Sequence, residues 1–166
     1  MPRTAALTDP KQLIHAVFID EMAHMSLDEA VRHFPARHMN TKPLNVSYTF
    51  WHILEHIRIA QWDLLQYVQN PKHVSPEWPE GYWPASDAMT DAAGWKRTIT
   101  AIKKDLERMD QLLSDPSVDI FAPVAFANNK SIVRCAFLAL EHNSYHLGEF
   151  AILRQVMQLW PKGRKG

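Results

Sequence analysis

The sequence predicts an all-α protein: a four-helix bundle in up-down-down-up order, with a long crossover between the second and third helices and a short extra helix after the first. Two observations support this. Four long segments repeat apolar residues at helical spacing, and proline- or asparagine-rich breakers separate them. No segment has the pattern of a strand of any length. The chain has 166 residues with no repeat or shift in composition, so we predict one domain spanning residues 1–166.

The first helix is predicted over residues 11–24, after the breaker Pro10, because apolar residues recur there at helical spacing. Ser26 and Glu29 then have the spacing of a capping box, in which each residue bonds to the backbone N–H of the other. A short helix is therefore expected to begin there and to end near Pro35.

The remaining helices follow from the same reasoning. The second begins near Val46 or Ser47 and ends before Pro71, the third covers residues 91–114, and the last runs from residue 131 to about residue 160. Each has an apolar stripe that predicts one face turned to a shared core.

The connector between the second and third helices is about twenty residues long, more than an antiparallel neighbour needs. Extended chain covers about 3.3 Å per residue, so this connector can cross the length of a bundle and let the two helices run parallel. Its aromatic residues Trp78, Tyr82 and Trp83 predict a segment that packs down on the helices. They either cap the mouth of the bundle or fill a hydrophobic site on its side.

Composition excludes several classes of function. Basic and acidic residues balance at 18 each, which gives no electrostatic reason to bind nucleic acid or an anionic membrane. No apolar run approaches the length of a membrane span. The single cysteine, Cys135, excludes an internal disulfide and is predicted to be a buried thiol. We therefore expect a cytoplasmic protein without nucleic-acid or membrane partners.

The candidate chemistry lies in the histidines. His142 and His146 are four residues apart, so they lie on one face of the last helix, the face that continues as Leu138 and Phe150. Two imidazoles thus point into the core, where each ring nitrogen needs a partner. A metal ion can supply one, and ordinary hydrogen bonds are the alternative.

A third imidazole comes from the second helix, where His52 and His56 share one face at a depth similar to that of the pair on the last helix. Their spacing alone leaves open which of the two joins His142 and His146. Three histidine ligands leave an open coordination position for water or a thiolate. Imidazole suits zinc, nickel, iron and copper alike.

Other metal motifs fit less well. A di-iron bundle needs Glu-x-x-His on two helices, and the chain has one such pair, Glu21 and His24, at the end of the first helix. The His-Glu-x-x-His motif of zinc proteases is absent.

These residues resemble those of the DinB-like (YfiT-like) superfamily of metalloenzymes. The similarity rests on Trp-His-Ile-Leu-Glu-His-Ile-Arg-Ile-Ala-Gln-Trp-Asp at 51–63 and on His-Asn-Ser-Tyr-His-Leu-Gly-Glu at 142–149. It implies an up-down-down-up bundle and a three-histidine metal site, with His56 as the ligand from the second helix. The loop at 125–130 departs from the family, because it lacks the histidine and glycines often seen there.

The resemblance implies a metal-dependent enzyme, either a transferase that uses a low-molecular-weight thiol or a small hydrolase. One divalent ion, zinc or nickel, is the expected cofactor and a small molecule the expected substrate, while no catalytic residue is assigned. His52, Tyr145 and Glu149 are candidates for supporting the ligands or lining a pocket. The alternative is a non-catalytic, stress-associated binding protein with a structural or vestigial metal. A homodimer is expected in either case.

Overall fold

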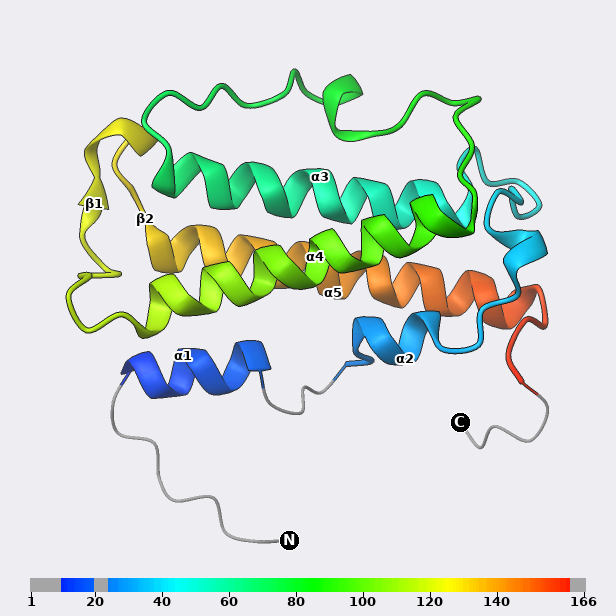
Figure 1. Cartoon of the computed structure of the whole chain (residues 1–166), viewed down its shortest axis with the longest axis horizontal. Coiled ribbons are helices and arrows are strands. Elements are labelled where there is room, and N and C mark those ends of the chain that lie inside the picture. Colours follow the sequence, from blue (N-terminus) through cyan, green and yellow to red (C-terminus); the bar gives the residue numbers. More distant parts are fainter. Residues whose placement is uncertain (1–9, 20–23, 162–166) are drawn as a thin grey trace, which may run out of the picture.

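The helices of the computed structural model confirm the predicted all-α class (Figure 1). The structure describes residues 10–19 and 24–161. Its elements are α1 (Pro10–Ile19), α2 (Leu27–Val31), α3 (Phe50–Gln69), α4 (Ala92–Ser114), β1 (Pro123–Val124), β2 (Lys130–Ser131) and α5 (Ile132–Val156). The two short strands pair antiparallel, with Pro123 opposite Ser131 and Val124 opposite Lys130.

Hydrogen-bonded caps set where the helices begin. The predicted capping box is present at α2, where the Ser26 hydroxyl accepts from the Glu29 N–H and the Glu29 carboxylate accepts from the Ser26 N–H. The side chains of Thr49, Asp91 and Ser131 cap α3, α4 and α5. Because Thr49 accepts from a backbone N–H of the first turn of α3, that helix begins a few residues later than the sequence predicts.

Two predicted ends differ from the structure. The last helix ends at Val156 instead of near residue 160, because Gln158 has a left-handed backbone conformation (φ 56°) and the Leu159 N–H turns back to the Arg154 carbonyl. The first predicted helix extended to residue 24, but His24 lies in a bend; α1 is described as far as Ile19, and residues 20–23, including Glu21, lie outside the described residues.

We expect Asp91→Ala to destabilise the protein by about 1 kcal/mol, because the Asp91 carboxylate accepts a 2.6 Å hydrogen bond from the Gly94 N–H at the start of α4. Urea denaturation followed by circular dichroism measures the change. Asp87→Ala, at an exposed position of the preceding loop, is the control. An equal loss of stability in both variants would contradict a capping effect.

The three long helices pack on one another, with α1 against α4 and α2 against α5. In Figure 1, α3 and α4 run in the same direction and α5 runs in the opposite one. The connector from residue 70 to residue 91 returns along the outer side of α3 before α4 begins. Within the described residues, no helix combines the length and the apolarity needed to span a membrane.

Two apolar clusters fill the interior. One contains Phe50 and Phe150 and the other contains Leu65 and Cys135, whose thiol is fully buried as predicted. Burial raises the pKa of that thiol. Between the residues of these two clusters, α3 carries the buried Gln61, and α5 carries the half-buried His142 and the buried Asn143 and His146. The buried His56 lies next to Ile57, at the edge of the first cluster.

Hydrogen bonds join the amides of these polar side chains across three helices. The Asn143 side-chain amide donates to the Gln61 carbonyl oxygen at 2.6 Å, and the Gln61 amide donates to the Ile102 carbonyl at 2.7 Å. Buried amides are costly unless they are hydrogen-bonded, so these bonds fix how α3, α4 and α5 lie against one another. The candidate site lies beside them.

Candidate metal centre

Three imidazoles from two helices meet in the interior. His56 comes from the middle of α3, and His142 and His146 come from consecutive turns of α5. The His56 Nε2 atom lies 3.0 Å from the His142 Nε2 and 3.1 Å from the His146 Nε2. Within the described part of the chain, these three residues form a group whose ligand atoms all lie within 4.8 Å of one another. The structure thus brings together the three histidines singled out in the sequence.

Hydrogen bonds on the far side of two rings orient them. The Nδ1 of His56 lies 2.8 Å from the backbone carbonyl of Tyr82, and the Nδ1 of His146 lies 2.8 Å from the Glu149 carboxylate. A carbonyl and a carboxylate can only accept, so each Nδ1 carries the proton. In the neutral rings both Nε2 atoms therefore present a lone pair to the shared centre.

This arrangement fits a divalent ion. Two lone pairs that face each other at 3.1 Å repel unless a cation lies between them. Bonds of about 2.0–2.1 Å from imidazole to zinc place tetrahedral ligands about 3.3 Å apart, close to the spacing of these nitrogens. Backbone carbonyl and carboxylate acceptors behind metal-ligating histidines are also the usual arrangement at such sites.

The pKa values agree with this state. Burial, together with the neighbouring imidazoles of His146 and His56, lowers the pKa of His142 to about 4. Burial also lowers the pKa of His56, although its bond to the Tyr82 carbonyl acts in the opposite direction. Both rings are therefore neutral at pH 7, the form that binds a metal ion.

Glu149 is held between two donors. It accepts from His146 and from the Tyr48 hydroxyl. Burial alone raises the pKa of Glu149, but these two hydrogen bonds, together with the electrostatic influence of His146 and His56, outweigh burial and bring that pKa below its usual value. Burial and the hydrogen bond to Glu149 raise the pKa of Tyr48 to about 12. The phenol therefore stays protonated and donates a hydrogen bond to the Glu149 carboxylate.

We expect Glu149→Gln to weaken metal binding about 10- to 100-fold, because an amide is a weaker acceptor for His146 Nδ1–H than a carboxylate is. Competition with a chromogenic chelator measures the affinity. The matched control is Glu141→Gln, at an exposed position directly before His142. Equal affinities in the two variants would show that Glu149 does not support the ligand.

The long connector supplies parts of the site through Tyr82 and Trp83, two of the three aromatic residues singled out in the sequence. Trp83 stacks on the His56 ring, with the ring centroids 3.8 Å apart and the planes 6° from parallel, and Tyr48 stacks on Trp83 with centroids 5.2 Å apart. Tyr82 gives its backbone carbonyl to His56 and donates its hydroxyl to Asp63 at 2.7 Å. Tyr82 and Trp83 thus pack onto α3 and cover the site.

His52 lies outside the histidine group. It is buried one turn before His56, and its Nε2 donates to the Ala88 carbonyl at 2.8 Å. His52 and His56 therefore hold two points of the same connector, at Ala88 and Tyr82, while His56 alone presents a nitrogen to His142 and His146.

A cavity of about 500 Å³ reaches the group at His142. Tyr145, predicted as a pocket candidate, is exposed and lines this cavity, and its ring contacts His146 edge-on with centroids 4.9 Å apart. Trp78 also lines the cavity and is exposed, so it does not pack down as Tyr82 and Trp83 do.

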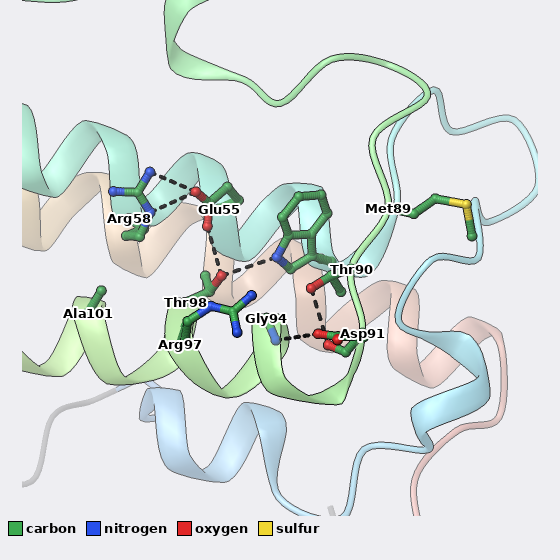
Figure 2. A pocket seen from close by; sticks show the side chains of 10 residues that line it. Glu55, Arg58, Met89, Thr90, Asp91, Gly94, Arg97, Thr98 and Ala101 are labelled. Atoms are coloured by element: carbon green, nitrogen blue, oxygen red, sulfur yellow. Dashed lines mark hydrogen bonds and ion pairs between the residues drawn. The ribbon is translucent and has the colours of Figure 1, made fainter.

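A second cavity, of about 640 Å³, lies between α3 and α4 (Figure 2). Its polar side chains bind one another: Trp51 donates to the Thr98 hydroxyl, which donates to Glu55, and Glu55 pairs with Arg58 at 2.7 Å. Glu55 directly precedes His56 in the chain, yet it serves to link the two helices.

A family of known proteins matches the part of the chain that contains the site. The profile of the DinB superfamily matches residues 20–150, which include all three histidines. No curated protein and no solved structure matches the chain. Because the match covers most of the 166 residues, the chain belongs to the DinB superfamily.

Proposed function

We propose that the protein is a metal-dependent enzyme in which His56, His142 and His146 bind one divalent transition-metal ion, zinc or nickel, beside a small-molecule site. The observation that carries this proposal is the convergence of three Nε2 atoms, two of them held as lone-pair donors by the Tyr82 carbonyl and Glu149. Bound there, the ion would supply Lewis-acid activation and an open position for a nucleophile.

The chain's own residues prepare that chemistry. Glu149 and the Tyr82 carbonyl orient two of the imidazoles before any ligand arrives, which reduces the cost of binding the ion. Trp83 covers the face of His56 and excludes water from it. The cavity that His142 lines offers an approach to the histidine group, so a substrate would enter there.

We infer that α1, α3, α4 and α5 form an up-down-down-up four-helix bundle around the site. The shared direction of α3 and α4, the reversed α5 and the contact of α1 with α4 support this inference.

We propose thiol transfer as the reaction. The thiolate sulfur forms a bond to an electrophilic carbon, the leaving group departs from that carbon with its electron pair, and the thiol proton passes to solvent. A thiolate is a good ligand for zinc and nickel, so an open position next to three neutral imidazoles favours the ionised thiol.

The test compares metal-loaded and chelator-treated protein, purified without a histidine tag, in the reaction of 1-chloro-2,4-dinitrobenzene with cysteamine, cysteine or glutathione. A rate above background that disappears with the chelator and returns with zinc or nickel supports the enzyme. An ion that stays bound while no thiol reacts faster than background would favour the non-catalytic binding protein with a structural metal.

A further inference from the structure

The cavity at His142 has walls of a defined chemical character. It lies between α3, α5 and the connector, and its lining is mostly apolar, with Ala60, Leu64 and Leu138 among the residues. Three aromatic side chains, Trp78, Tyr82 and Tyr145, complete these walls. A volume of about 500 Å³ holds a small organic molecule in contact with the histidine group.

The charges on the lining have one sign. Two carboxylates, Asp63 and Glu141, face the cavity, and the described residues that line it include no lysine or arginine. Glu141 is exposed. Asp63 is buried and fixed in place, because it accepts from the Tyr82 hydroxyl and from His73 Nε2, each at 2.7 Å.

The aromatic residues of the lining also favour a positively charged ligand. The centroids of the Trp78 and Tyr82 rings lie 5.4 Å apart with their planes at 61°, and Tyr145 on α5 also lines the cavity. The faces of aromatic rings attract cations, and this attraction strengthens as the cation loses water. The buried Asp63 carboxylate attracts a cation and repels an anion over several ångströms, and the exposed Glu141 carboxylate does so more weakly because water screens it.

We propose that this cavity binds an organic amine: a ligand with an apolar body and a positive charge, which would be the substrate class of the metal centre. This inference rests on the proposed function, since it takes the cavity as the substrate site of that centre. The apolar body packs on Leu64 and Leu138, and the ammonium group lies among Asp63, Glu141 and the aromatic faces. An aminothiol fits these walls, and a thiol with net negative charge does not.

The experiment uses three probes that share one apolar body: 4-phenylbutylamine, 4-phenylbutanol and 4-phenylbutyrate. Isothermal titration calorimetry at pH 7 measures their dissociation constants for the full chain, both metal-loaded and chelator-treated. The metal-free protein reports the walls alone, because no ion is present there to bind the carboxylate or amine directly. We expect the amine to bind about tenfold more tightly than the alcohol, and the carboxylate most weakly.

Glu141→Gln tests the charge without changing the shape of the cavity. We expect it to reduce the preference for the amine over the alcohol about threefold, whereas Glu107→Gln, at an exposed site of α4, leaves that preference unchanged. The inference is overturned if the carboxylate binds the metal-free protein as tightly as the amine, if no probe binds, or if Glu141→Gln leaves the preference unchanged.

These results stand apart from the proposed function. Metal analysis decides whether the ion is present, while the order of the three probes on metal-free protein decides the character of the cavity. Bound metal with a preference for the carboxylate would reject the amine and keep the metal centre. Absence of metal together with a preference for the amine would reject the metal centre and keep the amine-binding cavity.

Discussion

Replacing His142 and His146 together by alanine is expected to reduce bound metal from about one ion per chain to less than about a tenth. The double variant leaves only the His56 Nε2 atom in the group, and a single imidazole does not hold a divalent ion against water and buffer. Elemental analysis of protein purified without a histidine tag measures the ion. A chelator should lower the melting temperature of the wild-type protein and leave that of the double variant unchanged.

His52→Ala is the matched control for this prediction. His52 is also a buried histidine, one turn from His56, but its Nε2 binds the Ala88 carbonyl. We expect the variant to lose about 1–3 kcal/mol of stability from the orphaned carbonyl while keeping its ion. Full metal content in the double variant, or equal metal loss in His52→Ala, would contradict a site made by His56, His142 and His146.

Arg154→Ala is expected to cost about 3–5 kcal/mol of folding stability, the largest effect we expect away from the metal centre. The Arg154 side chain is fully buried on α5. Its guanidinium donates to the carbonyls of Ala30 at 2.6 Å, Arg32 at 2.8 Å and Leu159 at 3.3 Å. Alanine would leave these acceptors, of which the Ala30 and Leu159 carbonyls are buried, without their donor and open a cavity between α2, α5 and the chain after α5.

Aromatic contacts add to this effect. The guanidinium carbon of Arg154 lies 3.8 Å from the centroid of the Trp160 ring and 5.3 Å from that of Phe34. Arg154→Lys keeps the charge but lacks the planar fork that reaches several carbonyls, so an intermediate loss is expected.

Urea denaturation under metal-saturating conditions measures this change, because both variants then keep the same contribution from the ion. Arg134→Ala, at an exposed position on the same helix, is the control and should change stability by less than about 0.5 kcal/mol. A loss below about 1 kcal/mol in Arg154→Ala would show that α2 does not depend on this side chain.

The predicted elements that the structure confirms are those set by neighbours in the chain. Apolar residues three and four apart on 50–69 and 92–114 predict helices without knowledge of what covers them, and the Ser26–Glu29 spacing predicts a cap formed within four residues. The same holds for His142 and His146, which share a face because one helical turn separates them.

The features missed or left open depend on residues far apart in sequence. His52 and His56 share a face of α3, so either could have met the histidines of α5. The position of α3 along its axis relative to α5 brings His56, and not His52, next to them. An arginine on a helix is usually exposed to solvent, yet α2 and the chain after α5 enclose Arg154. The sequence could not single out the Tyr82 carbonyl as a partner of His56, because every residue has a backbone carbonyl.

The sequence by itself thus determined the helices, their caps and two adjacent imidazoles, since these depend on rotation and rise along one helix. Only the tertiary structure decided that a third imidazole meets them, that a carboxylate and a carbonyl orient the rings, and that an acidic, aromatic cavity opens beside them. The reason is physical. Where side chains of different helices meet is set by how the helices and the connector pack, and that packing is a property of the whole core.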